Sequence, residues 1–329
     1  MVRTEEFRRP AAAALRILGL AAVYYAAGRI GLLEQVVIAG AVVTPLWPPT
    51  GIALASLFIL GLRTWPGIAL GTMLVILTIS SLAVSSLLIM LGNTLAPVCS
   101  YLLLRKVGFR MELDRLRDGV ALVALGAFGG MLVSSTVASV TLMVSGRLPA
   151  SGFWPAWAAW WVGDAMGVLV VAPLLFALRT VRWPRAIRIY RWAEGAALLV
   201  SAVAVSLVAT RTPLALLFLV FPLIVWAALR FQLLGAAPVV LLVSVMAIVA
   251  ATRRIGAFEG QSLLQAMVNL QALNGSAALT ALLLSAIVTE QKTVRQKIEQ
   301  ACEELTEVVE RLAPGERTPR WPPADGRSR

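Results

Sequence analysis

The chain has no histidine, and this absence excludes several kinds of active site. A phosphoacceptor histidine, a serine–histidine–aspartate triad and the HExxH zinc motif all require an imidazole. The sequence also shows no pair of acidic residues or metal-ligand cluster that would indicate another catalytic design. We therefore expect a protein that is not an enzyme and that binds no cofactor and no metal.

Cysteine is almost as scarce as histidine, with two residues in 329. Cys99 falls within an apolar run and Cys302 within a polar helical segment near the end of the chain. A thiol inside an apolar span and a thiol in a polar helical segment cannot pair in a structural disulfide framework. We expect both to be ordinary free thiols.

Charged residues are also few, at 14% of the chain, whereas a soluble globular domain carries roughly 25%. Hydrophobic residues make up 59%. Apolar runs of about twenty residues, the length that a helix needs to cross roughly 30 Å of hydrocarbon, recur between Ala11 and Thr289. The first run shows no small-residue cleavage pattern, so it is interpreted as a span and not as a signal peptide.

These runs predict an all-α, polytopic membrane protein of about ten transmembrane helices. The expected spans are 11–32, 46–62, 65–81, 83–104, 119–143, 157–178, 193–210, 213–229, 232–251 and 268–289.

The connections between these spans alternate in charge. One set carries Arg63, Arg105, Lys106, Arg110, Arg115, Arg117, Arg179, Arg182, Arg185, Arg188, Arg191 and Arg230. The opposite set carries only Arg147, Arg211, Arg253 and Arg254. Because cytoplasmic loops retain Lys and Arg, both termini are expected in the cytoplasm of a bacterium, with the chain in its inner membrane. The basic residues behind the net charge of +12 are then explained by membrane topology. We expect the protein to contact the lipid bilayer and to bind no nucleic acid.

A heptad pattern follows the last span. Its seam positions are Ile287, Gln291, Val294, Ile298, Ala301, Leu305, Val308 and Leu312, separated by alternating steps of four and three, and all but Gln291 are apolar. This spacing is typical of a coiled coil, and it predicts a homodimer through the C-terminal helix; packing on the cytoplasmic loops of the same chain is the alternative. The expected organisation is an integral membrane domain over 1–290, a cytoplasmic coiled-coil helix over 291–313 and a disordered tail over 314–329.

Four short motifs lie within or beside the spans. The chain reads LWPPTGIAL at 46–54, GLRTWPG at 61–67, LGNTL at 91–95 and WWVGDAMGVL at 160–169, with Pro173 shortly after. Together they resemble the first family of bacterial membrane-associated sensor domains, the MASE group, whose pattern runs WPxxG, WPG, GNT and WWxGDxxG. The resemblance covers about 45–178 by motif and 190–290 by its run of spans.

The resemblance implies an integral membrane sensor, usually joined to a histidine kinase, a diguanylate cyclase or a PAS-containing region. This chain keeps the linking helix and shows no output domain, so we expect a separate kinase or cyclase as its partner. The family supplies no agreed ligand.

Asp164 is the strongest candidate for a binding residue, because an unpaired ionisable group inside a span costs several kcal/mol. We expect polar and aromatic side chains to gather around it in an outward-facing cavity: Trp160, Trp161, Asn93, Trp47 and Asn274, with Asn269 and Gln271 nearby. A buried polar network that only specifies helix packing is the alternative.

The remaining motif residues are expected to serve structure. They are Pro48, Gly51, Trp65, Pro66, Gly67, Gly163, Gly167 and Pro173. Proline in the first helical turn loses no hydrogen bond, tryptophan anchors a helix at the interface, and glycine allows helices to approach closely.

We therefore expect a sensory or regulatory module that perceives a signal in the cavity and relays it through the C-terminal helix. A small-solute transporter or permease is the alternative, since it would also have many spans and a buried Asp164. The chain shows no internal repeat of the kind common in transporters, which weighs against that alternative.

Overall fold

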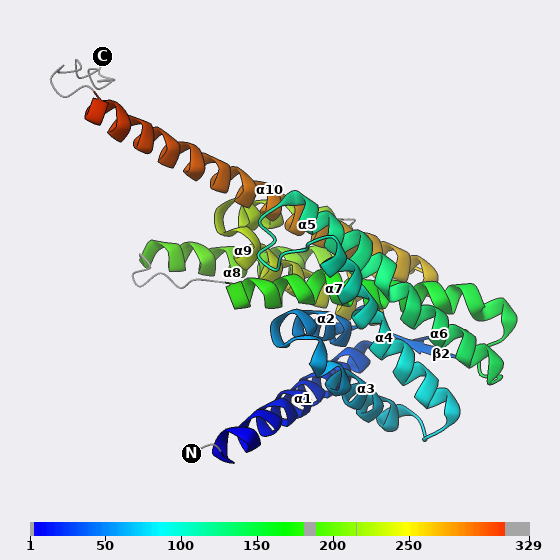
Figure 1. Cartoon of the computed structure of the whole chain (residues 1–329). Coiled ribbons are helices and arrows are strands. Elements are labelled where there is room, and N and C mark those ends of the chain that lie inside the picture. The colour runs from blue at the N-terminus through cyan, green and yellow to red at the C-terminus, as the bar shows by residue number, and fades with distance from the viewer. Residues whose placement is uncertain (1–2, 181–188, 215, 313–329) are drawn as a thin grey trace. The chain divides into compact units, whose positions relative to one another are not determined.

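The computed structural model describes residues 3–180, 189–214 and 216–312 (Figure 1). The predicted tail over 314–329 and the expected loop residues Arg182, Arg185 and Arg188 lie outside the described residues. Residues up to Thr289 form one compact unit, and residues from Glu290 onward form a second, which is described separately.

Ten α-helices follow one another along the described chain. They are α1 (Arg3–Gly31), α2 (Pro48–Leu60), α3 (Trp65–Ile79), α4 (Val84–Lys106), α5 (Leu116–Ala121), α6 (Gly130–Val144), α7 (Phe153–Thr180), α8 (Ile189–Arg211), α9 (Val220–Thr252) and α10 (Leu263–Leu312). A π-helical segment, η3 (Leu122–Gly129), joins α5 to α6. The chain is a polytopic helical membrane protein, as its composition predicts.

Eight helical segments in the described residues are long and apolar enough to cross a membrane. Each of the ten expected spans falls largely on helical backbone, but α2 has only 13 residues, which is about 20 Å of helix. The expected spans 213–229 and 232–251 both fall in α9, one before and one after its interruption at Gln232. The count of ten therefore remains a prediction.

The helix α9 is interrupted at Gln232, whose φ of 56° and ψ of −146° are not helical. The short 3-10 turns before and after α9, η5 (Leu217–Leu219) and η6 (Gly256–Phe258), both contact α8. Gly256 lies against the backbone of Thr210 and Arg211 at one end of α8, while Arg230 pairs with Glu194 at the other end. A straight helix of 33 residues would separate its ends by about 50 Å, so α9 folds back at Gln232 into two arms.

The helix α7 lies in the middle of the first unit, in contact with α2, α6 and α9. Every residue from Gly163 to Pro173 is buried. A helix that is apolar around its whole circumference is buried on all sides, which explains why α7 carries the chain's densest run of small and branched residues.

A two-stranded hairpin connects α1 to α2 and is an exception to the expected all-α fold. Strands β1 (Val36–Ile38) and β2 (Ala41–Val43) pair antiparallel, with Ala39 and Gly40 both at positive φ in the turn. Two successive residues at positive φ are the requirement of a tight hairpin turn. Ala41 and Val43 pack on Leu148 and Ala156, so the hairpin is held against the connection between α6 and α7.

Candidate functional site

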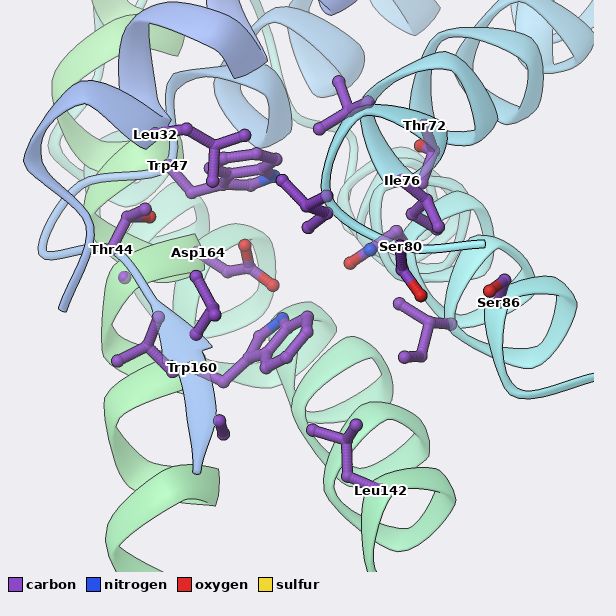
Figure 2. A pocket seen from close by; sticks show the side chains of 18 of the residues that line it. Leu32, Thr44, Trp47, Thr72, Ile76, Ser80, Ser86, Leu142, Trp160 and Asp164 are labelled. Carbon is purple, nitrogen blue, oxygen red and sulfur yellow. The ribbon is translucent and has the colours of Figure 1, made fainter. Parts of the chain in front are cut away.

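A cavity of about 230 Å³ opens between the hairpin and helices α3, α4, α6 and α7 (Figure 2). The hairpin contributes one wall, and α3 and α4 contribute mostly aliphatic side chains. Four of the six ligand-binding residues expected from the sequence line it: Asp164, Trp160, Asn93 and Trp47. Gly163 lines it as well.

Asp164 lies on α7 with 1% of its surface exposed. Its Oδ2 accepts a hydrogen bond of 2.5 Å from the Ser134 hydroxyl on α6. Figure 2 shows the carboxylate between the indole rings of Trp47 and Trp160, and the Trp160 N–H faces it. In the part of the chain that the structure describes, no ion pair joins Asp164 to a lysine or arginine. The carboxylate is thus held by neutral donors only.

Two further polar side chains of the cavity are buried and have unused hydrogen-bonding capacity. Asn93 on α4 is 5% exposed, and its Oδ1 has no partner among the described residues. The Thr72 hydroxyl on α3 is likewise without a partner there. Arg147, in the connection between α6 and α7, lines the cavity and is itself exposed. Buried polar atoms are nearly always hydrogen-bonded, so these unmet groups are sites where a ligand or water would bind.

Two of the sequence motifs are packing partners of each other. The backbone N–H of Trp47 donates to the Gly163 carbonyl over 3.0 Å, and the Thr50 hydroxyl donates to the Asp164 backbone carbonyl over 3.0 Å. Gly167 lies directly against the Trp47 carbonyl, where a Cβ atom would not fit. This contact of the WPPTG and WWVGDAMG segments places Trp47 and Asp164 in one wall of the cavity.

Glycines in the same two motifs make the approach of α2 and α7 possible. A side chain at Gly51 would collide with the Gly167 carbonyl and with Val171, and one at Gly163 would collide with the Thr44 carbonyl. Pro48 occupies the first turn of α2, where its missing N–H costs nothing. The structural roles of the motif residues remain a prediction, and these contacts show how each residue is packed.

The WPG motif belongs to a second helix pair, α1 and α3. Pro66 lies in the first turn of α3, Trp65 before it is 49% exposed, and Gly67 packs on the Ile17 carbonyl. Pro173 is buried within α7, beside Leu233. None of the three motif residues Trp65, Pro66 and Gly67 lines the cavity.

Two expected ligand residues do not line the cavity. Trp161 turns away from it: its N–H donates to the Phe128 carbonyl over 2.8 Å, and its ring stacks on Trp157. Asn274 on α10 is fully buried, and both of its side-chain polar atoms lack a partner among the described residues.

The neighbours expected beside Asn274 do not line the cavity either. The Gln271 amide donates to the Pro45 carbonyl over 2.7 Å, and the Asn269 amide donates to Gln261 over 3.0 Å. The polar side chains of α10 therefore do not join Asn93 in one cluster.

Ser134, Thr72 and Arg147 were not among the cavity residues expected from the sequence. Ser134 is one of three adjacent hydroxyl residues, Ser134 to Thr136, inside an apolar span, which is a signal that could have identified it. Thr72 and Arg147 carry no such signal, because their place in the cavity depends on how α3 and the connection after α6 pack.

The π-helical segment η3 lies beside this site. Two carbonyls of η3 accept side-chain hydrogen bonds from other helices: the Gly126 carbonyl from Ser100 over 2.8 Å and the Phe128 carbonyl from Trp161. π-helical turns frequently occur at functional sites. Ser134 lies in the second turn of α6, which continues from η3, so a change of backbone register in η3 would move the hydroxyl that donates to Asp164.

One family model, MASE1, matches residues 17–292. No curated protein and no solved structure matches the chain. The family match covers most of the chain. It includes α2, which begins within the WPPTG motif, and α7, which carries Asp164. The chain belongs to the MASE1 family of membrane-associated sensor domains.

Proposed function

We propose that this protein is a sensory module of a bacterial inner membrane that binds a small ligand in the Asp164 cavity and relays its presence to a cytoplasmic partner. The observation that carries the proposal is the composition of the cavity. Trp47, Trp160, Gly163 and Asp164 come from the two family motifs, and all four line one cavity of about 230 Å³. A buried carboxylate in a span is costly, which favours a functional reason for keeping it.

The distribution of basic residues supports an outward-facing cavity with both termini in the cytoplasm. The hairpin and Arg147 lie beside the N-terminal end of α7. Arg105 and Lys106 end α4, and Arg179 lies in the last turn of α7, at the opposite end of the bundle. Lys and Arg accumulate on the cytoplasmic side, so the hairpin end is assigned to the outside.

The exposed seam of the C-terminal helix supports a relay through dimerisation. In the unit that begins at Glu290, Val294, Ile298, Leu305 and Val308 are each about half exposed. Apolar residues at heptad spacing are stable in water when a partner helix covers them. A second copy of this chain would cover them, and a separate kinase or cyclase would read the rotation or separation of the paired helices.

A reporter fusion tests the proposal. A diguanylate cyclase domain is joined in heptad phase after Leu312 of the full chain, and cytoplasmic cyclic di-GMP is measured. Asp164→Asn removes the charge but keeps the shape, so we expect a changed output with an unchanged amount of protein in the membrane. Ser244→Ala is the control, because Ser244 is buried in α9 and does not line the cavity. Equal output from wild type and Asp164→Asn would refute the sensing role of this residue.

A small-solute transporter is the second candidate function. The buried Asp164 favours it, because an acidic side chain within a span would suit a coupling site. Uptake of a labelled solute into vesicles that is lost with Asp164→Asn would favour the transporter over the sensor.

A further inference from the structure

We infer that the Asp164 cavity selects a small organic monocation, namely a primary ammonium group on a short apolar chain. The inference rests on the proposed function, since it names the class of ligand for the same cavity.

The first argument is charge. Asp164 is buried, accepts a hydrogen bond from Ser134, and has no ion-pair partner in the described residues. A carboxylate in a low-dielectric site attracts a cation strongly and repels a second anion. A carboxylate or phosphate placed against Asp164 would therefore be repelled, and an ammonium group at that position would supply the missing counter-charge.

The second argument is the pair of indole rings. Trp47 and Trp160 both line the cavity, and Figure 2 shows them on opposite sides of the Asp164 carboxylate. The face of tryptophan attracts a cation more strongly than that of tyrosine or phenylalanine, and the attraction increases when water is excluded. Both indoles therefore line the cavity that a cation bound to the carboxylate would occupy.

The third argument is the balance of donors and acceptors. Besides Asp164, the cavity offers the Asn93 Oδ1 and the Thr72 hydroxyl oxygen, both buried and without partners in the described residues. A primary ammonium group has three N–H donors and no acceptor, so it suits a cavity that offers buried oxygens. A neutral alcohol has a single donor.

The rest of the cavity limits the size and total charge of the ligand. Aliphatic side chains of α3, α4 and α6 line it: Val75, Ile76, Ile79, Ile89 and Leu142. The volume of about 230 Å³ is below the roughly 300–1,000 Å³ of sites for drug-sized ligands. Arg147 at the exposed edge would repel a second positive charge, so the structure favours a monoamine over a diamine.

Such an ammonium group could come from two sources. A soluble amine would enter from the water, and an ethanolamine headgroup would enter from the surrounding lipid. Both present the same primary ammonium to Asp164, so lipid composition is used to distinguish them.

The experiment measures binding to the full chain in nanodiscs by isothermal titration calorimetry. Discs of phosphatidylglycerol are titrated with n-butylammonium, 1-butanol and butyrate, and empty discs correct for partition into lipid. We expect butylammonium to bind at least about tenfold more tightly than either analogue, as a charge-assisted contact in a buried site requires. Discs that contain phosphatidylethanolamine weaken butylammonium binding if the lipid headgroup is the natural occupant, and leave it unchanged if a soluble amine is.

Variants assign the preference to the named residues. Asp164→Asn should abolish it, Asn93→Leu should weaken butylammonium binding, and Trp160→Leu should weaken it about threefold or more. Ser244→Ala should bind as wild type does. If Asp164→Asn does not fold, the comparison of the three probes on the wild-type chain still decides the question.

Equal or tighter binding of butanol or butyrate, or no binding of butylammonium, overturns the inference. The fusion assay is independent of both results, because it compares Asp164→Asn with wild type without any added probe. A changed output there, together with failure of butylammonium here, would retain the sensor and reject the cationic ligand.

Discussion

The Ser134 hydroxyl donates a 2.5 Å hydrogen bond to Asp164 and thereby links α6 to α7 inside the bundle. Both residues are about 1% exposed. Ser134 follows the π-helical segment η3, so a shift of backbone register in η3 would move this donor relative to the carboxylate. In the proposed sensor, this link would couple the buried carboxylate to an irregular helix.

Replacing Ser134 by alanine should change the output of the cyclase fusion while leaving the protein in the membrane. The substitution removes a donor to a buried carboxylate, which costs about 1–3 kcal/mol of interaction free energy. Cyclic di-GMP in cells and the amount of protein in isolated membranes are measured together.

Ser135→Ala is the matched control for this prediction. Its hydroxyl donates only to backbone carbonyls of its own helix, those of Met131 and Leu132. Equal effects of the two alanine substitutions would show that the hydrogen bond to Asp164 is irrelevant to signalling.

Gly167→Ala should destabilise the membrane unit by about 1–3 kcal/mol, as is typical when a group is forced into a close-packed site. The added methyl group would collide with the Trp47 carbonyl and the Thr50 hydroxyl. Thermal unfolding in detergent should show a lower Tm. Gly19→Ala is the control, because nothing lies within 4 Å of its Cβ position and alanine is the better helix former. An unchanged Tm for Gly167→Ala would contradict the packing described here.

The spans and part of the site were predictable from the sequence, because each depends on a local property. Apolar length predicts a span, and the cost of an ionisable group in lipid identifies Asp164. By contrast, the neighbours that a helical residue faces depend on how the helices pack. Trp160 and Trp161 are about 100° apart around α7, so they face different neighbours, and only the packing of η3 shows that Trp161 bonds to Phe128.

The place of Asn274 was not predictable for a related reason. Asn274 is a polar residue in a span, like Asn93, but α10 buries it away from the cavity. Its environment depends on contacts between distant segments. The reversal of α9 is different, because Arg230 between two apolar runs predicts a connection between the spans 213–229 and 232–251, and the backbone reverses at Gln232.

The positions of the connections lead to a topology prediction. A reporter fused after Leu312 should read cytoplasmic, and one inserted between Ser145 and Gly152 should read outside, because Lys and Arg concentrate at the opposite end of the bundle from that connection. Paired phosphatase and green fluorescent protein fusions make the measurement. A single inverted reporter would contradict both the assigned orientation and the outward-facing cavity.

The C-terminal helix should form a parallel dimer in native membranes. In the register we assign, the a positions are Gln291, Ile298, Leu305 and Leu312, and the d positions are Ile287, Val294, Ala301 and Val308. Cys302 then occupies an e position beside the seam, and it is exposed. An e residue faces a g residue of the partner helix, so the two Cys302 thiols lie too far apart for a direct disulfide, and a bis-maleimide that spans the seam is used. It should give a linked dimer that disappears with Cys302→Ser and persists with Cys99→Ser, as judged on denaturing gels.

The same helix should transmit the signal by its rotational phase. Inserting one residue after Lys297 rotates everything beyond it by about 100°, so the seam of Leu305 and Val308 no longer continues that of Val294. Inserting seven residues adds two turns and restores the phase. We expect the cyclase fusion to lose its dependence on Asp164 with one inserted residue and to keep most of it with seven. If native membranes yield only monomer, or if the two insertions behave alike, the seam packs on its own chain and the output must leave the membrane unit by another route.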